Sequence, residues 1–168
     1  MSNKSTIVYS MGLVAIVLEL VAIIQPNWMK QSSSGVAAYE TNVGLWKTCG
    51  KGGGIDMCEN IPIGQNKNFP KHSLEACRIL AVLGIVLSFL GLLCVCLCRP
   101  ENKGVQMSLL ILGGLCSIIA SIVWSSELLK IKNEQGETNN FKPDYSLYLN
   151  LVGGVLSLGM AGYIQYKN

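Results

Sequence analysis

The segment 74-LEACRILAVLGIVLSFLGLLCVCL-97 decides the fold class of this chain. Charged side chains occur only near its start, at Glu75 and Arg78, and the remainder is almost wholly apolar. A helix of about 20 such residues spans the hydrocarbon core of a bilayer. We therefore predict a membrane-spanning helix over about 74–97.

Three further apolar stretches resemble this one in length and composition. They cover about 7–25, 105–129 and 145–166. Half of the chain is hydrophobic, 14% is charged and the mean hydropathy is +0.40, which exceeds what one soluble core of this size could bury. We predict a mainly α membrane protein with four helices in contact with the lipid bilayer. The net charge of +3 is small and scattered, so no nucleic-acid partner is expected.

The first apolar stretch contains one acidic residue, Glu19, in its interior. Because Glu19 interrupts the apolar run and no small-residue cleavage site follows, we interpret this stretch as a retained helix rather than a secretory signal. A carboxylate is costly at this depth, so Glu19 should be protonated, face the bundle interior or pair with a cation. Arg78, at the same end of the next helix, is a geometrically possible partner.

Loop lengths divide the chain unevenly. The connections at about 26–73 and 130–144 are long and polar, whereas the middle one is a few residues around Arg99 and Lys103. Both chain ends should lie on the side of the short connection. A raw count of Lys and Arg opposes the positive-inside rule, but long loops count for little in that rule. The cysteines are the stronger indication of sidedness.

Cys49 and Cys58 lie in the long loop on either side of a glycine-rich stretch. A turn there can bring two extended segments to disulfide distance. Disulfides persist outside the cell, which places this loop outside and both termini in the cytosol. The alternative is a pair of free thiols in a cytosolic loop.

The remaining five cysteines fall in or beside the apolar stretches. Cys94, Cys96 and Cys98 end the second stretch at the expected cytosolic edge, where reversible palmitoylation and simple packing are both open. Cys77 and Cys116 are interpreted as packing residues. A membrane thiol oxidoreductase would need a Cys-X-X-Cys pair, which the chain lacks, so we expect no enzyme, no metal and no cofactor.

The long loop and the residues that follow it carry a signature. It consists of Trp28, Gly44-Leu45-Trp46, Cys49, Cys58 and Arg78. In order and spacing this resembles the claudin family of tight-junction proteins, within the broader peripheral myelin protein/claudin superfamily, and the likeness extends over nearly the whole chain.

The resemblance implies a single domain, residues 1–168, with a left-handed four-helix bundle and a small extracellular antiparallel sheet. The runs Val36–Tyr39 and Val43–Thr48 are compatible with strands of that sheet. The implied function is a plasma-membrane protein of cell junctions, whose sheets form a paracellular barrier or an ion-selective pore. The implied partners are itself or other claudins, side by side and across cells.

The resemblance also indicates candidate pore charges. Glu59 follows Cys58 directly, where family members place such a charge, and Asp56 lies on the same hairpin arm. Cation preference is therefore the hypothesis, although the first loop as a whole carries more lysines than acidic residues.

Two departures from the family pattern favour a rival interpretation. Of the usual second-loop motif only Phe141-Lys142-Pro143 survives, with Phe141 and Pro143 as candidate contacts across cells. The chain stops at Gln165-Tyr166-Lys167-Asn168, so capture by a PDZ scaffold is not expected. The rival is a non-junctional relative that acts as an accessory subunit on a partner in its own membrane.

Overall fold

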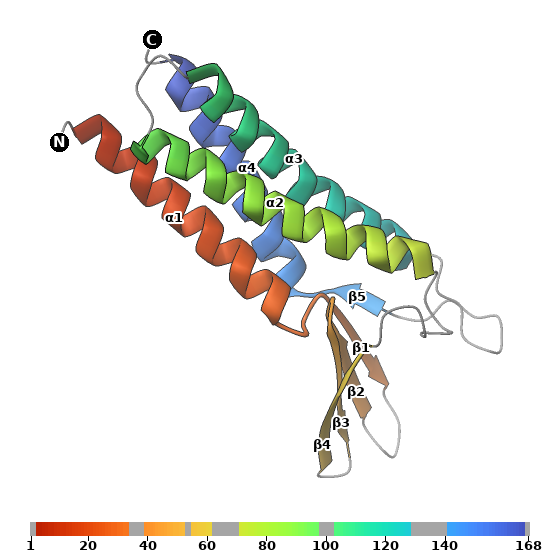
Figure 1. Cartoon of the computed structure of the whole chain (residues 1–168). Helices are drawn as coiled ribbons and strands as arrows, with labels where there is room; N and C mark the ends of the chain where they lie inside the picture. Colours follow the sequence, from red (N-terminus) through yellow and green to blue (C-terminus); the bar gives the residue numbers. More distant parts are fainter. Residues whose placement is uncertain are drawn as a thin grey trace.

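Four long helices form the body of the molecule (Figure 1). The computed structural model describes residues 3–33, 39–52, 55–61, 71–97, 103–128 and 141–166. The helices are α1 (Asn3–Ile24), α2 (Lys71–Leu97), α3 (Lys103–Leu128) and α4 (Tyr145–Tyr166). All four are long and apolar enough to cross a membrane. α1 ends at Ile24 because the residue before a proline, here Gln25, is driven out of the helical conformation.

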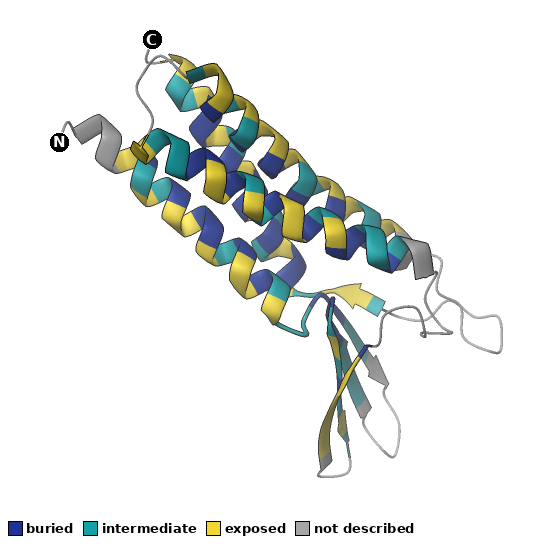
Figure 2. Ribbon diagram, in the orientation of Figure 1, coloured by how far each residue is buried: buried dark blue, intermediate teal, exposed yellow. Residues whose placement is uncertain are grey.

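The outward faces of the helices are apolar. Exposed large side chains include Val17 on α1, Phe89 on α2, Ile122 on α3 and Val155 on α4. Figure 2 shows such exposed positions alternating with buried ones along each helix. Water would oppose this exposure by roughly 25 cal/mol for each Å² of apolar surface. The bundle therefore has the surface of a protein that lies in lipid.

Small residues let the helices approach closely. A Cβ atom at Gly113 of α3 would lie 2.7 Å from the Ser88 backbone nitrogen on α2, and one at Gly114 would lie 2.7 Å from the Gly154 carbonyl oxygen on α4. Such close contacts replace the hydrophobic driving force that is missing between helices in lipid. α3 is consequently held between α2 and α4, while α1 packs mainly on α4.

One antiparallel sheet projects from an end of the bundle (Figure 1). Its strands are β1 (Met29–Ser33), β2 (Tyr39–Val43), β3 (Lys47–Gly52), β4 (Ile55–Asn60) and β5 (Phe141–Pro143), in the order β4-β3-β2-β1-β5. The first four strands lie between α1 and α2 in the chain, and β5 comes directly before α4. The start of α1, the end of α2 and the end of α4 lie at the opposite end of the bundle.

A buried apolar cluster joins the base of the sheet to the bundle. Trp28, Val43 and Leu45 from the sheet side pack with Leu74 of α2 and Trp124 of α3. This cluster, which we call the joint, is continuous with the helix interior (Figure 2). The base of the sheet is therefore packed firmly against the bundle.

The predicted fold class of four helices and a small antiparallel sheet is confirmed. The run Val43–Thr48, compatible with strand from sequence, contributes to two strands, because β2 ends at Val43 and β3 begins at Lys47. Residues 44–46 form a turn in which the Gly44 amide donates to the Lys47 carbonyl at 2.8 Å. Of the run Val36–Tyr39 only Tyr39 is among the described residues, and it begins β2.

Candidate functional site

Trp28 is fully buried where α1 gives way to the sheet. Its indole Nε1 donates to the Ala22 carbonyl at 2.5 Å, and its ring meets Trp124 of α3 edge to face, with centroids 5.7 Å apart. Its backbone amide donates to Val43 of β2, and its carbonyl accepts from Asp144, between β5 and α4. One residue thus connects two helices to β2 and to the link between β5 and α4.

The turn Gly44-Leu45-Trp46 fits against the end of α1. A Cβ atom at Gly44 would lie 2.5 Å from the Pro26 Cα atom, so only glycine allows this approach. The turn directs Leu45 into the joint, where it is fully buried. The Trp46 carbonyl accepts from the Ile61 amide at 2.8 Å, which fixes the end of β4 to the same turn.

Arg78 of α2 binds this turn from the side of the bundle. Its guanidinium donates from Nε to the Leu45 carbonyl at 2.7 Å and from Nη2 to the Ile61 carbonyl at 3.1 Å. Its Cζ atom lies 4.9 Å from the centre of the Trp46 ring, within cation–π range. A planar fork with several donors can bind two carbonyls at once, which a lysine ammonium cannot do with the same geometry. No ion pair joins Arg78 to Glu19 in the described part of the chain, so the pairing considered from sequence is not formed.

Cys49 and Cys58 form a disulfide between β3 and β4, as predicted. The two residues are direct partners in the register of the hairpin. The bond closes the last two strands of the sheet into a stapled unit, which limits how far the β4 edge can separate from β3.

The register places the two candidate pore charges on opposite faces of the sheet. Successive side chains of a strand alternate between faces. Asp56 is two residues from Cys58 and therefore shares its face, whereas Glu59 is next to Cys58 and takes the other. A hollow of about 380 Å³ on the disulfide face is lined by Pro26, Asn27, Asn42, Cys49, Gly50, Lys51, Asp56 and Cys58. Glu59 is not among its lining residues.

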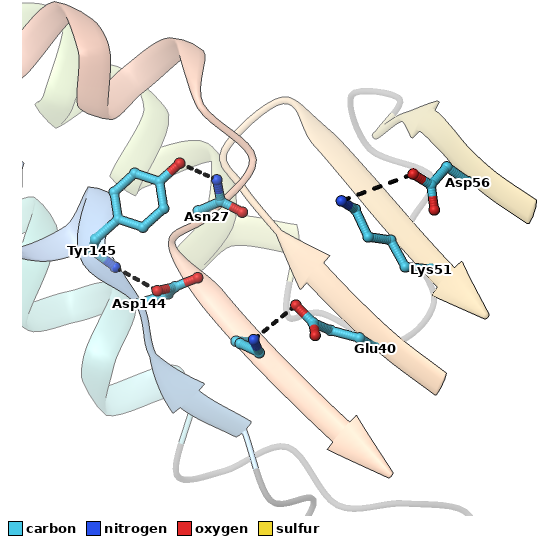
Figure 3. A network of polar contacts seen from close by, with 7 residues as sticks. Asn27, Glu40, Lys51, Asp56, Asp144 and Tyr145 are labelled. Carbon is cyan, nitrogen blue, oxygen red and sulfur yellow. Dashed lines mark hydrogen bonds and ion pairs between the residues drawn. The ribbon is translucent and has the colours of Figure 1, made fainter. Parts of the chain in front are cut away.

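Four charged residues on the disulfide face form two ion pairs across strands (Figure 3). Lys30 contacts Glu40 at 2.8 Å, and Lys51 contacts Asp56 at 3.8 Å. The hydrogen bond with Glu40 raises the pKa of the Lys30 ammonium, and the same bond lowers the pKa of the Glu40 carboxyl. Within the described residues Glu59 is exposed and has no ion pair. The opposite face therefore carries the uncompensated negative charge.

The candidate contacts across cells lie on β5. Phe141 is partly buried and packs against the joint cluster, whereas Pro143 is exposed. At the start of α4 the Asp144 carboxylate accepts from the Tyr145 amide at 2.8 Å, and the Asn27 side chain donates to the Tyr145 hydroxyl (Figure 3). The short strand is thus tied to the bundle at its end.

The candidate palmitoylation sites lie far from the sheet. Cys94 is half-buried and Cys96 is exposed at the end of α2, and Cys98 lies outside the described residues. The side chain of Cys77 is buried and donates to the Ala120 carbonyl at 3.7 Å, as a packing residue would. The described residues contain no group of three or more His, Cys, Asp or Glu side chains that could hold a metal ion.

Sequence reasoning singled out Glu19 but missed its surroundings. The Ser117 hydroxyl donates to Glu19 Oε1 at 2.9 Å, and the Asn150 side-chain amide donates to the Ser117 carbonyl at 2.9 Å. Asn150 is the one amide side chain inside the last apolar stretch apart from the terminal Gln165, a signal that could have directed attention to it.

Comparison with known proteins gives one family. The sequence over residues 5–165 matches the model of the PMP-22/EMP/MP20/Claudin family. No curated protein matches the chain.

Proposed function

Since this chain belongs to the PMP-22/EMP/MP20/Claudin family, we propose that it is a claudin-like protein of cell–cell junctions. Residues 1–168 act as one domain in the plasma membrane at tight junctions, with the sheet outside the cell and both termini in the cytosol. Its sheets associate with those of itself or other claudins, side by side and across cells. The assembly forms a paracellular barrier or an ion-selective pore and has no catalytic role.

The rigid mounting of the sheet is the observation that carries this proposal. Trp28 and Arg78 fix the turn and the strand ends to three helices, and the Cys49–Cys58 bond staples the outer hairpin. A wall that sorts ions must hold its charges in place, because an electrostatic barrier depends on distance. A sheet anchored at its base and stapled at its edge meets that requirement.

The direction of selectivity is proposed to come from Glu59. Two unit charges about 4 Å apart interact by roughly 1 kcal/mol in water and by several times more in a less polar constriction. Asp56 is weakened as a candidate, because Lys51 lies 3.8 Å away on the neighbouring strand. Because the two acids are on opposite faces, one channel wall cannot present both, and the unpaired Glu59 is the one we assign to cation preference.

Dilution potentials across an epithelial layer that expresses the protein test this assignment. Glu59→Gln should reduce the preference for sodium over chloride, and Glu59→Lys should reverse it. Asp56→Asn is the matched control on the opposite face and should change the preference much less. If Glu59→Lys leaves ion preference unchanged at equal surface expression, Glu59 does not line the pore.

A second candidate function is an accessory subunit that modulates a partner in the same membrane. The partial burial of Phe141 favours it, because its ring packs against the joint and is not fully available to a neighbouring cell. Contact across cells would then depend on Pro143 and Lys142, which are exposed. Reversible palmitoylation of Cys94 and Cys96 suits either function, because it would only tighten membrane attachment.

Freeze-fracture imaging of cells without junctions separates the two functions. Expression of a junctional protein should produce continuous intramembrane strands where cells touch. Dispersed single particles, with normal surface delivery, would support the accessory subunit. If Phe141 packs only within its own chain, the variant Phe141→Ser should still form intramembrane strands, provided that the variant folds.

A further inference from the structure

A polar cluster lies inside the bundle, away from the sheet and its charges. It consists of Glu19 on α1, Ser117 and Ser121 on α3, and Asn150 on α4, and all four side chains are buried. α4 makes room for it, since a Cβ atom at Gly153 would lie 2.6 Å from the Glu19 Cγ atom. Three helices therefore meet around one carboxyl group.

Hydrogen bonds in the cluster leave two atoms unsatisfied. Ser117 donates to Glu19 Oε1, and the Asn150 amide nitrogen donates to the Ser117 carbonyl and to Ser121 Oγ at 2.9 and 3.0 Å. Glu19 Oε2 and Asn150 Oδ1 are buried without a partner. An amide oxygen carries no hydrogen, so Asn150 Oδ1 can only accept and needs a donor.

No cation within the spanning helices is placed to balance an ionised Glu19. The only Lys or Arg side chains in the four spans are Arg78 and Lys103. Arg78 donates to the Leu45 and Ile61 carbonyls. Lys103 begins α3 and lies about 21 Å along the helix from Ser117, at 1.5 Å rise per residue. The groups that face Glu19 from α3 and α4 are hydroxyls, an amide and Gly153, none of which titrates.

We propose that Glu19 and Asn150 form a proton-binding site inside the bundle. The bound proton makes the Glu19 carboxyl neutral, and its Oε2–H donates toward Asn150 Oδ1, so that each unsatisfied atom supplies what the other lacks. An unpaired carboxylate at this depth would instead be costly. With the neutral acid, a continuous set of hydrogen bonds through Glu19, Ser117 and Asn150 links α1, α3 and α4, and we call this set the clasp.

The clasp has a consequence for the sheet. α1 leads into β1, and β5 leads into α4, and these two strands pair through Met29 with Pro143 and Gln31 with Phe141. By fixing α1 against α4, the clasp holds together the two helices that carry β1 and β5. Glu19 is in this sense a positioning residue, and its role does not depend on whether the protein forms junctions.

Infrared spectroscopy of the full chain in lipid nanodiscs tests the proton directly. The other acidic side chains that the structure describes are at least partly exposed, so Glu19 should give a protonated-carboxyl absorption at neutral pH. That absorption should disappear in Glu19→Gln and persist in Glu59→Gln. It should shift to higher frequency in Asn150→Leu, which removes the acceptor. Absence of the band from the unmodified chain, or its survival in Glu19→Gln, overturns the proposal.

Thermal unfolding supplies a second test that separates a neutral clasp from a buried ion. Glutamine has the size of glutamic acid, can accept from Ser117 and can donate to Asn150, so Glu19→Gln should melt within about 2 °C of the unmodified chain. Glu19→Ala leaves a cavity and should melt roughly 5 to 10 °C lower. Leu20→Ala, at a partly lipid-exposed position of the same helix, is the control and should shift the midpoint much less. If Glu19→Gln melts as low as Glu19→Ala, or fails to fold, the site does not hold a neutral acid.

Discussion

Replacing Arg78 by lysine should loosen the sheet from the bundle while keeping the positive charge. The guanidinium binds the Leu45 and Ile61 carbonyls together, and a single ammonium in its place would leave one of them without its donor. A buried carbonyl that loses its partner costs about 1 to 3 kcal/mol. Loss of the contact with the Trp46 ring adds roughly 0.5 to 2 kcal/mol.

The expected total for Arg78→Lys is therefore roughly 2 to 4 kcal/mol, because the two losses are partly shared. Hydrogen exchange, followed by mass spectrometry on peptides from β3 and β4, measures the opening of the sheet against the bundle. A loss of this size should accelerate exchange by roughly 30- to 1000-fold, since each 1.4 kcal/mol is a factor of ten. Peptides from the middle of α3 should exchange at the unmodified rate.

Lys47→Met is the matched control, because it removes an exposed cation from the same sheet. It should leave exchange in β3 and β4 within a factor of about three. Arg78→Met should accelerate hydrogen exchange in β3 and β4 more than Arg78→Lys does, since both carbonyls then lack a donor. Exchange in Arg78→Met as slow as in the unmodified chain would refute the role of Arg78 as the anchor of the turn.

The remaining predictions concern the two other anchors and the surface ion pair. Trp28→Phe keeps an aromatic ring but loses the 2.5 Å bond from the indole, and should lower the thermal midpoint by roughly 3 to 8 °C; an unchanged midpoint would show that the bond contributes nothing. Gly44→Ala introduces a Cβ atom against the backbone of Pro26, which cannot withdraw, and should make the turn sensitive to limited proteolysis where the unmodified chain resists. The Lys30–Glu40 pair should add a small, salt-sensitive increment at neutral pH. The folded-state pKa of Glu40 is lowered, so the stability that Glu40 contributes is lost as pH falls through this pKa. The folded-state pKa of Lys30 is raised, so the stability that Lys30 contributes is lost as pH rises through this pKa. Melting curves of Glu40→Gln and the unmodified chain should therefore differ near neutral pH and converge in acid, and equal curves at all pH values would contradict this.

Sequence alone could predict those features whose cause lies in neighbouring residues of the chain. Apolar length predicts the four helices, and the glycine-rich stretch between Cys49 and Cys58 predicts that the two can approach. Pro26 ends the first helix, expected at about residue 25 and observed at Ile24, for a reason that holds in any fold. These features were predicted because each depends on its immediate neighbours.

The features that sequence could not place depend on register and on packing between helices. That Asp56 lies opposite Lys51 and Glu59 opposite Thr48 follows from how β3 pairs with β4, and a shift by one residue would change both partners. The partners of Glu19 come from α3 and α4, far along the chain, so no local pattern identifies them. The break between β2 and β3 at residues 44–46 has the same origin, because the close approach of Gly44 to Pro26 is a tertiary contact that overrides strand propensity.

Mass spectrometry of intact cells treated with membrane-impermeant reagents tests the account most directly, since everything proposed for the sheet requires the Cys49–Cys58 bond to lie outside the cell. The account predicts that an impermeant maleimide modifies neither cysteine until an impermeant reductant is added, and that both are then modified without permeabilising the cells. Labelling of either cysteine before reduction, or only after the membrane is opened, would contradict it.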